Sequence, residues 1–197
     1  MRIQLIPGPA LATAALLASA CGGGGPQHVS DITPVVSERL SGAWVLNEAE
    51  SDDPEEALGG GGGGGMGSGV PPGGARGGRM KPAAMQALRR MATGTPRTLQ
   101  ISLSDSLAVI AFPREEPWLL PYGDKVTREL SEDVEVEARA QWENNRLILT
   151  RQVSGGGVVT ETFMPSVDGK RLTVAVEFAP GGPGGVEFQR VYERPRA

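Results

Sequence analysis

The chain of 197 residues carries 19 basic and 23 acidic side chains and one histidine, so its formal net charge at pH 7 is −4. This acidic balance argues against a general nucleic-acid-binding protein. The single histidine, His28, excludes a histidine-based catalytic triad and a histidine-rich metal site. No Gly-x-Ser-x-Gly motif or phosphate-binding loop occurs either. We therefore predict no catalytic residues, no metal site and no cofactor, and we do not expect an enzyme.

The first 20 residues have the order of an export signal. Arg2 supplies a positive charge, and the uncharged run 10–20 is too short to cross a bilayer core of about 30 Å. Ala18 and Ala20 place small side chains just before Cys21, which is the only cysteine in the chain. The stretch Leu-Ala-Ser-Ala-Cys that ends at Cys21 resembles the lipobox of bacterial lipoproteins.

This resemblance implies that residues 1–20 are removed as a signal peptide and that the thiol of Cys21 receives a lipid that anchors the chain to a membrane. Gly22 stands where aspartate would favour the inner membrane, which implies the outer membrane with the domain facing the periplasm. The alternative is an ordinary cleaved signal peptide with an incidental cysteine. We predict a flexible tether at 21–37 and a folded domain at 38–197.

Residues 48–81 form a segment of unusual composition inside that domain. It begins with acidic side chains, contains thirteen glycines between Gly59 and Gly78, and ends with basic side chains. Such a segment loses backbone entropy on ordering and buries little apolar surface in return. We therefore predict that 48–81 is a disordered glycine-rich insertion.

The rest of the domain reads mostly as short strands. Apolar side chains alternate with polar ones from Val134 to Trp142, and Asn144-Asn145 favours a tight hairpin turn. Further alternating runs are expected at 40–47, 99–103, 107–112, 147–153, 158–164, 172–178 and 186–192. Between Pro82 and Met91 the apolar spacing becomes helical instead, with a stripe of Ala84, Leu88, Met91 and Ala92.

Together these patterns predict an all-β fold: a single antiparallel meander β-barrel of eight to ten strands with one short helix and the disordered insertion. Closing the meander into a barrel removes the exposed sheet edges that would otherwise pair with other chains.

The first strand carries the motif Gly42-Ala43-Trp44, which resembles the Gly-x-Trp of lipocalins and related calycins. The resemblance implies that an arginine from the last strand packs across Trp44 at the closed end of the barrel. We assign this role to Arg190, with Arg194 as the alternative partner. The segments 44–47 and 191–194 also resemble the two ends of a group of uncharacterised bacterial envelope lipoproteins.

One charged pair lies on apolar strand faces. Arg151 shares a face with Leu147, Leu149 and Val153, and Glu161 lies between Val159 and Phe163 on the next strand. If both side chains point inward, they form an interior ion pair that orients the polar head of a ligand. The alternative is a pair of outward cross-strand charges worth a fraction of a kcal/mol.

Three functions are compatible with this sequence. The first is a lipocalin-like module that binds a small apolar or amphiphilic ligand near the outer membrane. The second is a structural or assembly lipoprotein with a filled barrel that contacts an envelope protein. The third is an enzyme, for which the sequence offers no catalytic residues. A cavity in the barrel would favour the first function, and an exposed apolar patch the second.

Overall fold

The computed structural model describes residues 34–60, 80–94, 96–113, 115–181 and 185–196. Cys21, the predicted signal peptide, most of the predicted tether and the run 61–79 lie outside the described residues, together with the predictions that rest on them. In the described part of the chain, no helix has both the length and the apolar character that a membrane span requires.

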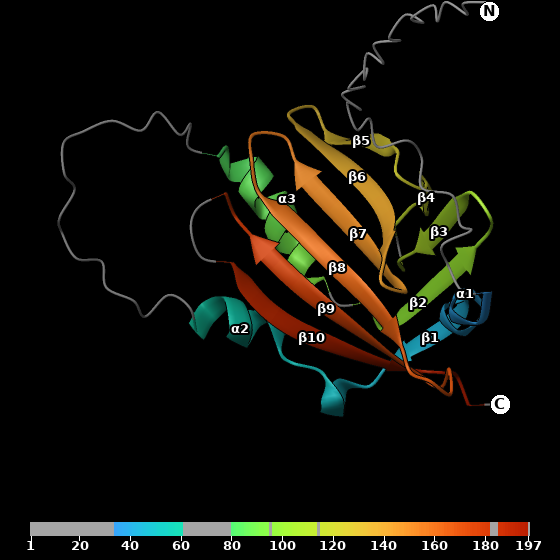
Figure 1. Ribbon diagram of the computed structural model, residues 1–197. Coiled ribbons are helices and arrows are strands. Elements are labelled where there is room, and N and C mark those ends of the chain that lie inside the picture. Colours follow the sequence, from blue (N-terminus) through green and yellow to red (C-terminus); the bar gives the residue numbers. More distant parts are fainter. Residues whose placement is uncertain (1–33, 61–79, 95, 114, 182–184, 197) are drawn as a thin grey trace, which may run out of the picture.

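Ten antiparallel strands form one sheet that curls into a near-closed barrel (Figure 1), which confirms the predicted meander. The strands are β1 (Gly42–Leu46), β2 (Thr98–Leu103), β3 (Leu107–Ala111), β4 (Trp118–Pro121), β5 (Lys125–Ser131), β6 (Val134–Glu143), β7 (Arg146–Val153), β8 (Val158–Pro165), β9 (Arg171–Ala179) and β10 (Val186–Glu193). Their order in the sheet is β4-β3-β2-β1-β10-β9-β8-β7-β6-β5, so β4 and β5 are its two edges.

Local sequence explains the strands and their turns. Along β6, buried and more exposed side chains alternate from Val134 to Glu143, as expected for a strand with one face in the core. Asn144 and Asn145 both adopt positive φ angles, 49° and 63°, which close the hairpin to β7. Strands β4 and β5 were not predicted, because residues 118–131 show only short runs of alternating apolar and polar side chains.

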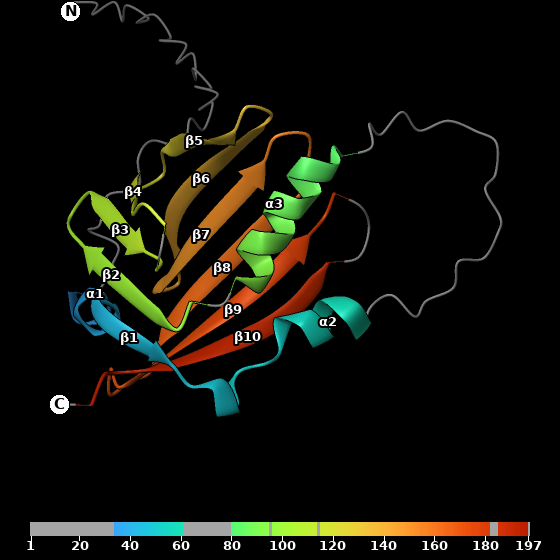
Figure 2. The ribbon, with the colours of Figure 1, turned by 180° about the vertical axis from the view of Figure 1, so that it is seen from behind.

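Within the described residues, four helical elements accompany the barrel, more than the one short helix predicted: α1 (Pro34–Leu40), the 3-10 turn η2 (Glu48–Glu50), α2 (Pro54–Gly60) and α3 (Pro82–Thr93). Helix α3 is the predicted one, and it buries the predicted positions Ala84, Leu88 and Ala92. It lies across the inner side of β7, β8 and β9, with α2 beside β10 (Figure 2). Residues 34–37, which we assigned to the tether, belong to α1.

The prediction that the whole of 48–81 is disordered is wrong for residues 48–60. Ser51 and Asp52 lie beside the part of β10 that does not pair with β1. The Asp52 carboxylate accepts from the backbone N–H of Gln189, and the Ser51 hydroxyl oxygen accepts from the backbone N–H of Val191. The Asp53 carboxylate then caps α2 by accepting from the backbone N–H of Glu55 at 2.8 Å. These polar bonds order the acidic segment without a large apolar core.

The first and last strands of the chain, β1 and β10, pair with each other at the closed end of the barrel. Val45 pairs with Glu193, and the residues that adjoin this pair are in contact: the guanidinium carbon of Arg194 lies 3.9 Å from the Trp44 ring centroid. Arg190 lies four residues back along β10, about 13 Å at strand spacing. The assignment of Arg190 to Trp44 is therefore wrong, and the alternative, Arg194, is the stacking partner.

Gly42 has a direct role in this contact. Its φ of +122° is one that side chains rarely adopt, and a Cβ built on it would lie 2.2 Å from Nη1 of Arg194. The glycine thus leaves the space through which Arg194 reaches Trp44. The indole Nε1 donates to the Leu40 carbonyl at 3.0 Å, which ties α1 to the same closed end.

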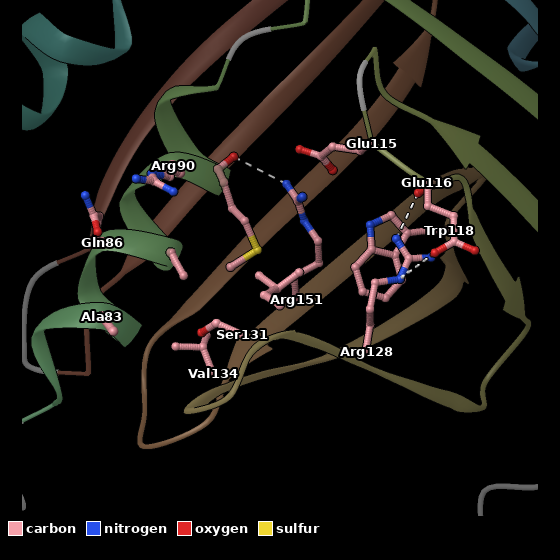
Figure 3. A pocket seen from close by; sticks show the side chains of 13 residues that line it. Ala83, Gln86, Arg90, Glu115, Glu116, Trp118, Arg128, Ser131, Val134 and Arg151 are labelled. Atoms are coloured by element: carbon pink, nitrogen blue, oxygen red, sulfur yellow. Dashed lines mark hydrogen bonds and ion pairs between the residues drawn. The ribbon is translucent and has the colours of Figure 1, made fainter.

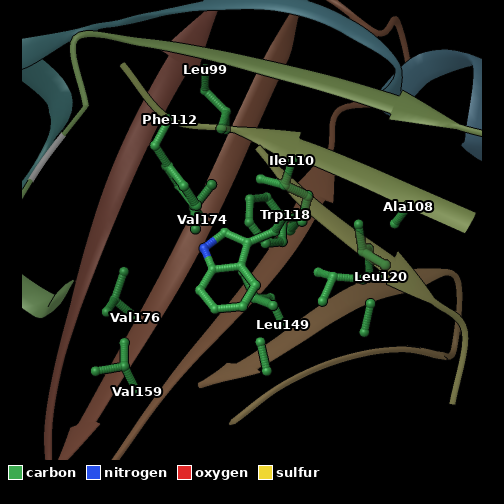
Figure 4. Packing of buried hydrophobic residues seen from close by; sticks show 14 of the residues in the cluster. Leu99, Ala108, Ile110, Phe112, Trp118, Leu120, Leu149, Val159, Val174 and Val176 are labelled. Carbon is green, nitrogen blue, oxygen red and sulfur yellow. The ribbon is translucent and has the colours of Figure 1, made fainter. Parts of the chain in front are cut away.

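Side chains fill much of the barrel interior. Ile110 and Leu120 from β3 and β4 face Leu149, Val159 and Val174 from the opposite strands (Figure 4). These residues belong to one buried apolar cluster that extends from Leu40 to Tyr192.

Candidate functional site

A cleft of about 490 Å³ opens between helix α3 and the part of the sheet where β4 and β5 approach each other. Its walls come from α3, the loop before β4, β5, the start of β6 and β7. Figure 3 shows side chains from these elements converging on one space. The volume falls within the range of about 300–1,000 Å³ that is typical of small-molecule sites.

One long wall of the cleft is apolar and belongs to α3. Ala83, Ala87 and Met91 line it. Their spacing of four residues places them along one side of the helix, next to the buried face described above. Leu130 and Val134 line the facing wall. This part of the cleft suits a slender apolar group.

The floor of the cleft is charged. Arg151, only 3% exposed, lines the cleft and donates to Oε2 of Glu161 at 2.7 Å. Arg190 donates to the other oxygen, Oε1, at 3.0 Å. Glu161 and Arg190 are each 1% exposed, so the three side chains form a buried Arg–Glu–Arg cluster. Such a cluster is tolerated in an interior because each charge has a partner.

The same two arginines hold the C-terminal end of α3. Arg190 donates to the carbonyl of Ala92, and Arg151 donates more weakly to the carbonyl of Met91 at 3.4 Å. The last carbonyls of a helix have no partner inside the helix and carry partial negative charge, so guanidinium groups stabilise them. The charged cluster therefore fixes α3 over the barrel.

Tyr192 lies beside this cluster on β10. Burial raises the pKa of its hydroxyl above the ordinary value of 10.0, while the nearby positive charge of Arg190 acts in the opposite direction. Burial is the larger effect, so Tyr192 stays neutral over the physiological range of pH.

Two residues that line the cleft each have a buried N–H group without a hydrogen-bond acceptor among the described residues: Nε of Arg151 and Nε1 of Trp118. Trp118 begins β4, is 2% exposed, and lines the cleft together with Arg151. Nε of Arg190 is likewise unpartnered, but Arg190 does not line the cleft. Leaving a buried donor unpaired costs about 1–3 kcal/mol, so an acceptor supplied by a ligand would be favourable here.

Arg128 spans the seam between the two edge strands. From β5 it donates to the carbonyls of Glu116 and Pro117 at 2.8 and 2.9 Å, just before β4. Its guanidinium carbon also lies 4.0 Å from the centroid of the Trp118 ring. Figure 3 shows this arginine beside Trp118 at one side of the cleft. The Arg128 side chain thus supplies hydrogen bonds between the two edge strands, β4 and β5, which do not pair with each other through their backbones.

The structure brings Arg151 and Glu161 together inside the barrel, in the arrangement that places both side chains inward rather than outward. Arg190, assigned to Trp44, joins that pair instead. Gly42 and Trp44 lie at the closed end with Arg194, and none of the three lines the cleft. Cys21 lies outside the described residues. Among those that are described, no group of three His, Cys, Asp or Glu side chains could hold a metal ion.

Sequence reasoning missed Trp118 and Arg128. Both fall in the short region where no strand was assigned, and neither belongs to a motif. One signal was available: Trp118 is one of only three tryptophans in the chain, and large aromatic side chains are rarely left outside a core or a binding site. Its pairing with Arg128 depends on the barrel closing and has no sequence signal.

Comparison with known proteins shows a likeness of fold. No protein-family model matches the sequence, and no curated protein matches it. Among solved structures, the chain is similar to a Schistosoma mansoni fatty acid binding protein in complex with arachidonic acid, with 14% identity, coverage of 82% of this chain and 99% of that chain, and a TM-score of 0.50.

Two further solved structures match with slightly lower TM-scores. Caenorhabditis elegans lipid binding protein 8 matches at 14% identity over 84% of this chain and all of that chain, with a TM-score of 0.49. Secretory abundant heat soluble protein 4 from Ramazzottius varieornatus matches at 14% identity over 80% and 96%, also with a TM-score of 0.49. At 14% identity and a TM-score of 0.50, the match to the fatty acid binding protein shows the fold alone. The likeness is one of fold.

Proposed function

We propose that this chain is a lipid-anchored protein of the bacterial envelope that binds a small apolar or amphiphilic ligand and catalyses no reaction. The observation that carries the binding role is the cleft beneath α3, whose apolar walls end on a buried charged floor. A ligand with an apolar body and a polar end matches that division, since each part meets surface of its own kind.

The solved structures support the ligand class in coarse terms. Their names include a fatty acid binding protein and a lipid binding protein, and they share the barrel architecture. We place the ligand in the cleft at the side of the barrel, under Ala87 and Met91 of α3.

Binding is tested directly with N-phenylnaphthylamine, a neutral apolar dye that fluoresces when it leaves water. The purified protein should enhance the dye's fluorescence, and Ala87→Trp should abolish the enhancement because the indole fills the cleft. Met85→Trp places the same side chain on the exposed part of α3, away from the cleft, and should leave dye binding unchanged. Equal dye binding by both variants would overturn the proposed site.

Mass spectrometry of molecules that copurify with the protein identifies the natural ligand class. We expect an apolar or amphiphilic small molecule in extracts of the wild type and its loss from Ala87→Trp. Recovery of the same molecules from both proteins would show that they do not occupy the cleft.

The anchor is tested separately at Cys21. A lipid at this residue would place the protein at the outer membrane, facing the periplasm, and several acyl chains would make the attachment stable. Cys21→Ser should move the protein from the membrane fraction to the soluble fraction and remove the mass of the acyl chains. A serine variant that still sediments with membranes would refute lipidation at Cys21.

A second candidate, an assembly lipoprotein that contacts an envelope protein, is favoured by one observation. Leu119 on edge strand β4 is 54% exposed, next to the paired Val109 on the outer face of β3. Exposed apolar side chains at a sheet edge are typical of contact surfaces. Leu119→Lys should abolish copurification of a partner protein and leave dye binding intact if this candidate is correct.

A further inference from the structure

The cleft also indicates which polar end the ligand carries. We propose that Arg151 and Trp118 form an anion subsite: the ligand is an amphiphile whose anionic oxygens accept from Nε of Arg151 and from Nε1 of Trp118. This inference rests on the proposed function, because it assumes that the cleft binds an amphiphile, and it adds the charge of the head group and the residues that recognise it.

The charge balance of the buried cluster favours an anionic ligand. The buried cluster contains two guanidinium groups, on Arg151 and Arg190, and one carboxylate, on Glu161. In their ordinary charge states these groups leave one positive charge in the interior. The C-terminus of α3 offsets roughly half a charge through its carbonyl groups. A positive remainder in a buried site favours an anion over a neutral or cationic group.

The unpaired hydrogen-bond donors also favour an anionic ligand. Nε of Arg151 and Nε1 of Trp118 have no acceptor among the described residues, although both are shielded from solvent. Arg151 is only 3% exposed, and Trp118 is only 2% exposed. Both are donors only, so a ligand that satisfies them must present acceptor oxygens. Carboxylates and phosphates supply these, and an ammonium group does not.

Arg151 can bind a ligand oxygen at Nε and keep the bonds that it makes through Nη2. Its Nη2 donates to Glu161 at 2.7 Å, but its contact with the Met91 carbonyl is long, at 3.4 Å. Because both of these contacts use Nη2, an anionic oxygen that accepts from Nε leaves the ion pair to Glu161 in place. Arg190 keeps its own bond to Ala92 meanwhile, so α3 stays attached to the barrel while the ligand is bound.

The rim of the cleft does not reverse this preference. Arg90 and Arg128 lie there with Glu115 and Glu116, which balance in charge. Glu116 lies 3.9 Å from Arg128, and both glutamates are exposed to solvent, where their charges are screened. The buried floor therefore decides the sign of the preferred head group.

Carboxylate and phosphate amphiphiles share an anionic oxygen at the end of an alkyl chain. Competition against the bound dye tests whether the cleft prefers such ligands. Four ligands of equal chain length are compared: decanoate, decyl phosphate, decanol and decyltrimethylammonium. Decanoate or decyl phosphate should displace the dye at a concentration at least about tenfold lower than the other two, because a hydrogen bond to a charged group is worth about that factor. Whichever anion competes better identifies carboxylate or phosphate as the head group.

Trp118→Phe removes one donor and keeps an aromatic ring, and it should reduce the advantage of the anions about tenfold. Trp142→Phe is the matched control, because Trp142 is also a buried indole but does not line the cleft. Arg151→Lys keeps the charge but loses the Nε donor, and it should reduce the same advantage. Arg146→Lys, an exposed change on the same strand, should not.

The outcomes separate the two proposals. Displacement by decanol and decyltrimethylammonium as strong as by the anions would overturn the anion subsite and leave apolar binding intact. Absence of dye binding by the wild type would overturn the proposed function itself. An anion preference that survives both Trp118→Phe and Arg151→Lys would show that other residues recognise the head group.

Discussion

The guanidinium group of Arg194 lies over the ring of Trp44, with its central carbon 3.9 Å from the ring centroid, and it also donates to the carbonyls of Gly169 and Arg39 at 3.1 and 2.7 Å. One side chain thus joins β1, the β8–β9 turn and the end of α1 at the closed end of the barrel. Burial lowers the pKa of this arginine, which nevertheless keeps its charge at physiological pH.

Replacing Arg194 with alanine should destabilise the fold by about 2–3 kcal/mol, because both the stacking contact and two hydrogen bonds are lost. Urea unfolding followed by tryptophan fluorescence measures this change. Arg196→Ala, two residues along the chain and exposed, should cost under about 0.5 kcal/mol. Equal losses for the two variants would argue against a closing role for Arg194.

Replacing Glu161 with glutamine should be the most damaging single change in the interior. It removes the carboxylate shared by Arg151 and Arg190 and leaves two buried guanidinium groups without a counter-charge, at a cost of about 3–5 kcal/mol. Thermal unfolding measures the loss, with Glu177→Gln on the exposed part of β9 as the control. A melting temperature for Glu161→Gln close to that of the control would contradict the buried cluster.

Gly157 and Gly155 provide a matched pair in the β7–β8 turn. Both have positive φ angles near 90°, so an alanine at either position is strained by about 1–2 kcal/mol. A Cβ at Gly157 would also lie 2.5 Å from Cδ2 of Leu88 and 2.6 Å from Cε of Met80, whereas nothing lies within 4 Å of one at Gly155.

We therefore expect Gly157→Ala to destabilise the protein by about 1 kcal/mol more than Gly155→Ala, since Leu88 must shift and α3 with it. Hydrogen exchange of the α3 amides should also accelerate in Gly157→Ala only. Identical stabilities and exchange rates in the two variants would show that α3 does not pack closely on this turn.

Stability should fall at alkaline pH partly because of Tyr192. Its pKa is raised in the folded state, above the ordinary value of 10.0 that applies to the unfolded chain, mainly because of burial. Below pH 10 the Tyr192 hydroxyl is neutral in both the folded and the unfolded chain, so its contribution to folding stability is fully present. Above pH 10 the unfolded chain releases the proton first, so folding stability declines as the pH rises.

Unfolding by urea at pH 9 and pH 11 measures this decline. Tyr192→Phe should show a smaller loss between the two pH values than the wild type, because the substituted side chain does not titrate. An unchanged pH dependence in Tyr192→Phe would show that other groups cause the alkaline loss.

The cleft shows why some of the site was predictable and some was not. Arg151 and Glu161 each lie among apolar residues at a spacing of two, so strand alternation alone placed both on inward faces. Arg190 and Arg194 share the same alternation, and nothing in the sequence gives the register of β10 against β1. That register, with Val45 opposite Glu193, puts Arg194 rather than Arg190 at Trp44.

The order of residues 48–60 also depends on contacts that composition does not reveal. The segment looked disordered because it is acidic and followed by glycines. Its Asp53-Pro54 step is a helix-start signal that fits the observed cap of α2. The bonds from Ser51 and Asp52 to β10 exist only because the last strand is longer than the first and leaves part of its edge unpaired.

The sequence by itself determined the antiparallel barrel, the turn at Asn144-Asn145, helix α3 and the inward faces of Arg151 and Glu161, because each follows from local periodicity or backbone preference. Only the tertiary structure decided the stacking partner of Trp44, the joining of Arg190 to Glu161, the bond of both arginines to the end of α3, and the cleft between Trp118 and that helix. These features depend on strand register and on the meeting of β4 with β5, and both are set by packing between residues far apart in the chain.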